Sequence, residues 1–278
     1  MRLPKILLLL LAAGTALADD RAYLLGAGLE TDSDDGLRGS LLAGVEVGDS
    51  TWLSGGFAAA SVELASGRTS HTRYVDVEFD HHFDPIGIAL GVAYWGDPDL
   101  LDSVDQRFSL YFRNERFSIA GEYEYRDFDF IIPPTNFFPG REFAFDADGF
   151  GARIRYEFTK TFRMSASAMK YDYSVDFRPD ENRDAVSLLT ISRFSLINSL
   201  VDSRASMSFG VDVGSGQWGF DYATWKGALD QSRTKSYTVR FLHPMSTRTD
   251  LELALGYDDS DLYGNITFLS LYLFFYGS

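Results

Sequence analysis

One short stretch restricts the possible folds more than any other feature of the sequence. ERFSIAGEYEYRDFDF, beginning at Glu115, first places an apolar residue or glycine at every second position, with Glu122 and Glu124 on the other face. Phe128 and Phe130 then take the parity of the glutamates. Period-two alternation indicates a β-strand with two unlike faces. The strict part has the length that a lipid-crossing strand requires, about nine to eleven residues.

The same period recurs along most of the chain. Further stretches that alternate in this way are 75–80, 86–94, 107–113, 204–211, 237–241 and 251–257. Helical periodicity is hard to find. No stretch after the first eighteen residues is apolar for long enough to suggest a transmembrane helix. We therefore expect an all-β protein.

The change of face recurs in the next two expected strands. Alternation from Phe150 to Phe158 ends at a short turn, and farther from that turn Phe143 and Phe145 lie on the opposite parity. Beyond the turn, the run that starts at Phe162 changes face in the same way. One shift of this kind is typical of a bulge. Three shifts at one height, about ten residues above the turns, indicate a boundary between lipid and water.

Short and long connections alternate along the sequence. The expected short turns are 48–50, 84–85, 114–115, 159–160, 201–203 and 243–246. The expected longer loops are 31–36, 66–68, 96–103, 131–140, 178–184, 226–232 and 258–264. If 203–225 is one long strand, about fourteen strands result, an even number. This layout predicts a transmembrane antiparallel up-and-down β-barrel with short periplasmic turns and longer extracellular loops.

A soluble sandwich or a lipocalin-type barrel is the structural alternative. In either fold the apolar faces would have to meet inside, and the charged faces would form the outer surface. Many of the expected strands exceed fifteen residues when their extensions are included, whereas sandwich strands usually hold about five or six. Strand length therefore favours the membrane barrel.

The first eighteen residues have the features of a secretory signal peptide. Arg2 and Lys5 precede the apolar run 6–13, and Ala16 and Ala18 supply the small residues of a cleavage site. We expect cleavage before residue 19 and a single barrel domain over 19–278. The expected mature chain begins directly in a strand, so no N-terminal plug is expected.

Composition excludes several classes of function. The chain has no cysteine, which excludes disulfides and thiolate metal sites. Its net charge of −15 argues against nucleic acid as a partner. The acidic loops lack the spacing of a calcium loop, so neither a metal nor a cofactor is expected. Divalent ions that bridge these loops to lipopolysaccharide are the alternative to simple solvation.

The chain resembles the outer-membrane β-barrels of Gram-negative bacteria, of the porin type, over essentially all of 19–278. This resemblance rests on the architecture and on the last strand, NITFLSLYLFFYGS from Asn265. Such aromatic-rich closing segments imply the barrel-assembly machinery, outer-membrane lipid and lipopolysaccharide as partners. The strand departs from the family pattern because Gly277 and Ser278 follow Tyr276, where a terminal aromatic is usual.

If the apolar face meets lipid, the polar face lines the lumen. By parity this predicts a lumen lined by Asp76, Glu78, Asp80, Arg107, Arg113, Arg116, Glu122, Glu124, Arg126, Arg153, Arg155, Arg204, Arg240 and Glu252. Opposed rows of charge in a wet pore create a transverse field that orients solutes. Alternatively, the arginines and carboxylates pair and fill the interior.

The loop 128–143 is a candidate mouth or gating loop. It contains aromatic and proline residues that would stiffen it, namely Phe130, Pro133, Pro134, Phe137 and Phe138. The alternative is a rigid surface loop that packs its own aromatics.

The expected function is passive diffusion of small hydrophilic solutes through a charged lumen in the outer membrane. A non-conducting structural barrel, or one that handles lipids or hydrophobic solutes, is the alternative. A lipid hydrolase is disfavoured, because His71 beside Ser70 is the only plausible catalytic pair and no nucleophile motif accompanies it.

Overall fold

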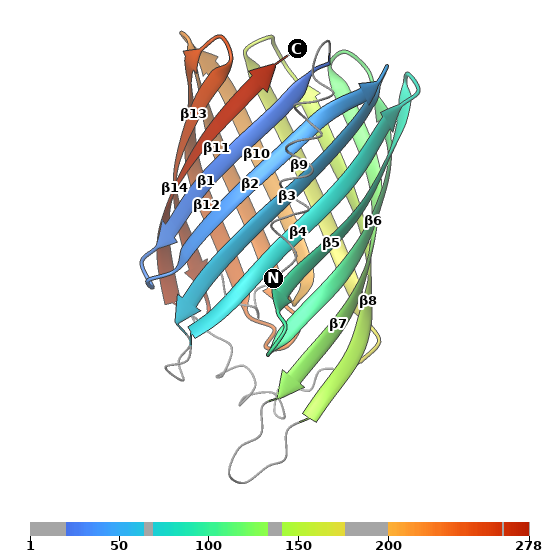
Figure 1. Cartoon of the computed structure of the whole chain (residues 1–278), viewed down its shortest axis with the longest axis vertical. Helices are drawn as coiled ribbons and strands as arrows, with labels where there is room; N and C mark the ends of the chain where they lie inside the picture. Colours follow the sequence, from blue (N-terminus) through green and yellow to red (C-terminus); the bar gives the residue numbers. More distant parts are fainter. Residues whose placement is uncertain (1–20, 64–68, 133–140, 176–199, 263, 278) are drawn as a thin grey trace.

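The protein is a closed barrel of fourteen antiparallel β-strands in sequence order, so the predicted fold class and strand number are confirmed (Figure 1). The computed structural model describes residues 21–63, 69–132, 141–175, 200–262 and 264–277. The strands are β1 Tyr23–Asp32, β2 Leu37–Gly48, β3 Thr51–Glu63, β4 Thr69–His82, β5 Ile86–Asp97, β6 Leu101–Arg113, β7 Phe117–Ile132, β8 Arg141–Glu157, β9 Phe162–Tyr173, β10 Val201–Val213, β11 Gly216–Gly227, β12 Arg233–Ser246, β13 Thr249–Ser260 and β14 Gly264–Gly277.

The barrel closes where β1 pairs with β14, from Tyr23 opposite Gly277 to Asp32 opposite Phe268. Short turns lie at one end of the barrel, at the top of Figure 1, and the longer connections lie at the other. We call these the short-turn end and the long-loop end. The strands β7 and β8 extend furthest past the long-loop end. The described part of the chain contains no helix long and apolar enough to cross a membrane.

Two predicted turns were wrong. Residues 201–203 belong to β10, and the turn lies at 214–215, where Gly214 has a φ of +62°. The expected single strand 203–225 is therefore two strands, and 176–199 lie outside the described residues. The described residues still form fourteen strands, the number expected, and the strand expected between the loop 178–184 and the misplaced turn falls almost wholly outside them. The turn expected at 243–246 lies at 247–248 instead, because β12 continues through Pro244 to Ser246.

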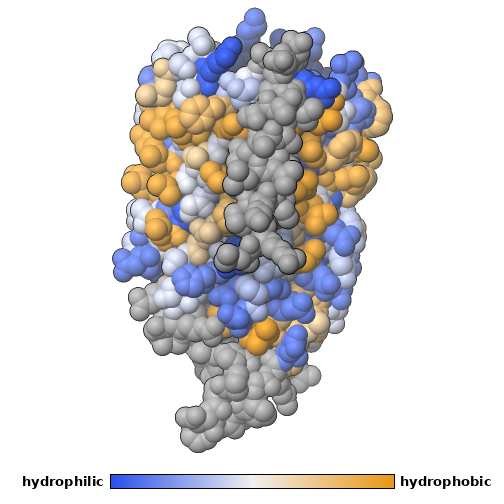
Figure 2. All heavy atoms as spheres, in the orientation of Figure 1, coloured by the Kyte–Doolittle hydropathy of each residue, from blue (hydrophilic) through white to orange (hydrophobic). Residues whose placement is uncertain are grey.

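The outer surface of the barrel is apolar, as the alternation predicted. Leu90, Val92, Leu110 and Phe150 are 47%, 54%, 50% and 65% exposed, although all four lie within strands. Figure 2 shows such residues as an orange band on the visible wall, with blue hydrophilic residues at both ends. Large apolar side chains exposed in a continuous belt have no favourable environment in water. The belt matches the apolar band with which transmembrane barrels meet lipid.

The change of face on β7 and β8 is confirmed. Near the long-loop end Phe128 is fully buried inside the barrel and Phe145 is 6% exposed, whereas Asp127 and Asp129 are exposed outside. Beyond the apolar belt, towards the long-loop end, the apolar side chains of these strands thus face the interior and no longer the outside. There the outer face carries carboxylates, as a surface in water requires.

Inward-facing glycines let large neighbours lie flat against the wall. A Cβ on Gly87 would stand 2.1 Å from the ring of Tyr111, its cross-strand partner. A Cβ on Gly256 would stand 1.9 Å from the ring of Phe268, its partner on β14. Covering a glycine with a cross-strand aromatic ring is a known way to fix register and curvature in a barrel.

Candidate functional site

Two cavities at different heights are lined by described residues of the lumen. The larger, of about 780 Å³, is lined by residues of β2 to β11, including Arg107, Arg153 and Arg204. The smaller, of about 300 Å³, lies towards the short-turn end and is lined by residues that include Arg155 and Arg240. Residues of β8 to β13 line the smaller cavity, and both cavities are bordered by inward-facing side chains of the barrel.

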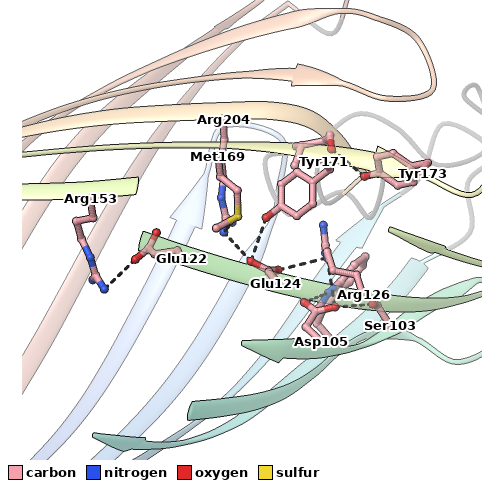
Figure 3. Close-up of polar contacts among 12 residues, drawn as sticks. Ser103, Asp105, Glu122, Glu124, Arg126, Arg153, Met169, Tyr171, Tyr173 and Arg204 are labelled. Carbon is pink, nitrogen blue, oxygen red and sulfur yellow. Dashed lines mark hydrogen bonds and ion pairs between the residues drawn. The ribbon is translucent and has the colours of Figure 1, made fainter. Parts of the chain in front are cut away.

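A buried ionic cluster lies on the wall of the larger cavity, on β6 and β7 (Figure 3). The guanidinium of Arg126 lies 3.2 Å from Asp105 and 3.5 Å from Glu124, and all three side chains are less than 10% exposed. Trp95 donates from Nε1 to Asp105 at 2.9 Å, and Ser103 donates from Oγ at 2.5 Å. The carboxylate of Asp105 is thereby held by three donors.

Aromatic rings surround the same arginine. Its guanidinium carbon lies 5.1 Å from the ring centroid of Trp95, 4.9 Å from that of Phe128 and 5.4 Å from that of Tyr171. Cation–π contact is strongest where the cation has been removed from water, as here. Arg126 therefore joins β5, β6, β7 and β9 through charge and stacking together.

The neighbouring arginines are paired but exposed to the cavity. Arg153 Nη2 lies 2.8 Å from Glu122 Oε1, and Arg204 Nη2 donates to Glu124 Oε2 at 2.9 Å. Tyr171 donates to the same oxygen of Glu124 at 3.0 Å. Figure 3 shows these side chains converging from different strands on the two glutamates. In the described part of the lumen these arginines are thus paired with carboxylates, as the second of the two alternatives for the charged interior expected.

The other predicted lumen residues fall into three groups. On β4, Asp76 lies 3.6 Å from Arg107, and Asp80 accepts a hydrogen bond of 2.7 Å from Tyr111. Glu78 lies between Asp76 and Asp80 on the same face of β4. On the opposite side Arg240 pairs with Asp221 and, at 3.7 Å, with Glu252. At the short-turn end lie Arg155, which pairs with Glu157 at 3.2 Å, Arg113, which ends β6, and Arg116, which lies in the turn 114–116 because β7 begins at Phe117.

Sequence reasoning missed several lumen residues. Arg38 on β2 lines the larger cavity. Arg163 on β9 lines the smaller one and donates to Asp212 at 2.6 Å. Asp105 accepts a hydrogen bond from Arg126, and Asp221 accepts one from Arg240. Parity identifies Arg163, because it shares a face with Ser165 and Ser167.

An apolar cluster occupies part of the interior at the long-loop end. It consists of Val62, Trp95, Leu100, Leu101, Phe128, Phe145, Ala147, Leu200 and Leu229, with Phe130 packed against it. The candidate gating loop thus contributes Phe130 to this cluster, while Pro133, Pro134, Phe137 and Phe138 lie outside the described residues. The predicted change of face turns Phe128 and Phe145 inward, but nothing in the sequence indicated that residues of several strands and loops gather around them.

The pair considered for catalysis lies at the start of β4, where it is hydrogen-bonded to Asp97 at the end of β5. Ser70 is 1% exposed, and its hydroxyl donates to Asp97 Oδ2 at 2.9 Å. The backbone N–H of His71 donates to the same oxygen at 3.1 Å. The hydroxyl of Ser70 is therefore buried and bonded to Asp97, whereas a serine activated by histidine would donate to the imidazole.

The acidic loops are organised by their own backbone. Asp32 accepts from the N–H groups of Asp34 and Gly36, at 2.9 and 2.8 Å. Burial and the neighbouring carboxylates raise the pKa of Asp34 in this loop. Among the residues that the structure describes, no group of three or more metal-ligating side chains is placed to hold an ion.

The sequence matches no protein-family model and no curated protein. Solved structures do share its fold. The CymD monoaromatic hydrocarbon channel superimposes with a TM-score of 0.58 over 95% of this chain and 90% of its own, at 10% identity. OmpT, an outer-membrane protein of Vibrio cholerae, gives a TM-score of 0.52 over 92% of this chain and 97% of its own, at 11% identity.

The NanC porin gives a TM-score of 0.50 over 90% of this chain and 98% of its own, at 9% identity. At identities this low the likeness shows the fold alone. The protein thus shares the closed β-barrel fold of these proteins and covers nearly their full length.

Proposed function

We propose that the protein is a passive diffusion channel for small hydrophilic solutes, exported to the outer membrane by residues 1–18. The observation that carries this proposal is the charged cavity of about 780 Å³ inside a barrel whose outer wall is apolar. A barrel of eight strands can be filled by side chains, whereas about sixteen strands leave a water-filled channel. Fourteen strands leave room for a narrow passage.

A second candidate function is favoured by the apolar cluster at the long-loop end. Trp95, Phe128 and Phe145 form a buried surface inside the barrel that would suit an aromatic or aliphatic solute. A protein of similar fold is named as a monoaromatic hydrocarbon channel. On this alternative the barrel handles hydrophobic solutes and does not conduct ions steadily.

Planar-bilayer recording on refolded protein separates the two functions. Steady single-channel steps support the diffusion channel. A barrel that is fully inserted but electrically silent favours the alternative. Charge reversal in the double variant R153E/R155E tests whether these side chains line the conducting path. The reversal potential in a KCl gradient should then shift towards that of a channel more selective for K⁺ over Cl⁻. An unchanged reversal potential places both residues outside the path.

A further inference from the structure

In two ion pairs of the lumen, the arginine is much more exposed to the cavity than its carboxylate partner. The side chain of Arg153 is 56% exposed, whereas its partner Glu122 is 20% exposed. The side chain of Arg204 is 51% exposed, and Glu124 behind it is 6% exposed. Each carboxylate lies behind its arginine, so the surface that a passing solute meets is mainly guanidinium.

A neighbouring arginine provides an internal contrast. The side chain of Arg126 is 6% exposed, and those of its partners Glu124 and Asp105 are 6% and 8% exposed. Arginines that only fill the barrel and neutralise carboxylates are expected to be covered in this way. The exposure of Arg153 and Arg204 is therefore more than structural pairing requires.

The exposed arginines continue along one wall. Arg153 and Arg155 are inward neighbours on β8, two residues apart, which corresponds to about 6.5 Å along a strand. Arg153 and Arg204 line the larger cavity, and Arg155 lines the smaller one, where its side chain is 54% exposed. The three guanidinium groups thus connect the two cavities.

Serines complete this wall. In the sheet, Arg153 pairs with Ser167, which pairs with Ser206, and Arg155 pairs with Ser165, which pairs with Ser208. Ser167 and Ser206 line the larger cavity, and Ser165 and Ser208 line the smaller one. Hydroxyl groups donate or accept as needed, so the surface beside the arginines remains polar and adaptable. We call these seven residues, Arg153, Arg155, Arg204, Ser165, Ser167, Ser206 and Ser208, the arginine–serine wall.

We propose that the arginine–serine wall binds the carboxylate group of small organic anions as they cross the barrel. A guanidinium has five N–H donors in a planar fork that matches a carboxylate. The contact of Arg153 with Glu122 occupies only one edge of that fork, and the exposed remainder is available to a solute. This inference rests on the proposed channel function and adds the class of solute to it.

The test is block of single-channel current by succinate in about 0.15 M KCl, where the Debye length is about 8 Å. Erythritol, a neutral solute with the same number of carbons, is the reference compound. Succinate is expected to reduce the current of the wild type at concentrations where erythritol does not. Since carboxylates on β4 and β13 also face the lumen, the selectivity of wild type for K⁺ over Cl⁻ does not isolate this wall, whereas block by a carboxylate does.

The variant R153Q/R155Q removes two guanidinium groups and leaves the pairing of Glu124 intact. It should raise the half-blocking concentration of succinate about tenfold, because two exposed charge-assisted contacts, each worth up to about fivefold in affinity, are lost. R204Q is the second variant and should act in the same direction. R116Q, which changes an arginine in the short turn 114–116, is the matched control, and succinate should block it as it blocks wild type.

The outcomes distinguish the inference from the function beneath it. Channels that conduct but are blocked equally by succinate and erythritol, or equally in R153Q/R155Q and wild type, overturn the inference and leave the channel function standing. Inserted wild type that conducts no current overturns both. Selective block that is lost in both wall variants and kept in R116Q supports the proposal.

Discussion

Replacing Arg126 with methionine should destabilise the barrel far more than the same replacement at Arg153. Arg126 is buried against Asp105 and Glu124, and removal of one partner from a buried ion pair costs about 3–5 kcal/mol. Each carboxylate keeps other partners here, Trp95 and Ser103 for Asp105, and Arg204 and Tyr171 for Glu124. We therefore expect the lower end of that range, about 3 kcal/mol.

The matched replacement R153M breaks an ion pair of 2.8 Å whose arginine is more than half exposed. Exposed pairs contribute about 0.2–1 kcal/mol, so R153M should cost less than about 1 kcal/mol. Methionine is used at both sites because it retains much of the apolar stem and removes the charge. The difference between the two variants, about 2 kcal/mol, therefore measures the burial of the ionic cluster.

The assay is reversible urea unfolding of the barrel in lipid vesicles, followed by tryptophan fluorescence. Trp95, which lies in the cluster, makes the signal sensitive to this region. The double variant D105N/R126M should recover part of the loss, because asparagine removes the uncompensated charge and still accepts from Trp95. Equal costs for R126M and R153M, or no recovery in the double variant, would refute the reasoning.

Two further predictions concern the wall itself. G87A should destabilise the barrel by about 1–3 kcal/mol in the same assay, because the added Cβ meets the ring of Tyr111 at 2.1 Å, whereas G121A, which meets no atom within 4 Å, should be close to neutral. Equal effects of the two alanines would contradict this packing. L90R places a charge in the outer apolar belt, where Leu90 is 47% exposed, and should cost about 2–4 kcal/mol if that position lies near the bilayer midplane. The control D129R lies on the exposed face above the belt and should cost less than about 1 kcal/mol; comparable losses would mean that the belt does not contact lipid.

The barrel could be predicted from the sequence because its alternation obeys two boundary conditions at once. Lipid outside and charge inside require opposite residue types on successive positions, which leaves a clear pattern in stretches such as 75–80. Turn positions were less certain. Val201, Asp202 and Ser203 have the composition of a turn, yet they belong to β10, and the actual turn uses the positive φ of Gly214. The glycines at 214 and 216 were the available signal.

The site could be predicted only in part, because parity gives the direction of a side chain but not its partner. Arg126 and Arg153 share the same predicted face, yet one is buried among rings and the other is exposed to the cavity. That difference depends on residues distant in sequence, such as Trp95 and Tyr171. The apolar cluster is likewise assembled from several strands and loops, so no single stretch of sequence predicts it.

The most direct test of the central claim is the reactivity of single cysteines on adjacent positions of β9. The chain contains no cysteine, so each introduced thiol is unique. Ser167 lines the larger cavity, and Ala166 has the opposite parity, towards the lipid. A charged, membrane-impermeant thiosulfonate should modify S167C in bilayer-inserted protein and reduce its conductance, while A166C remains unmodified. Rapid modification of A166C with S167C protected would place water outside the barrel and apolar contacts within it, contrary to this account.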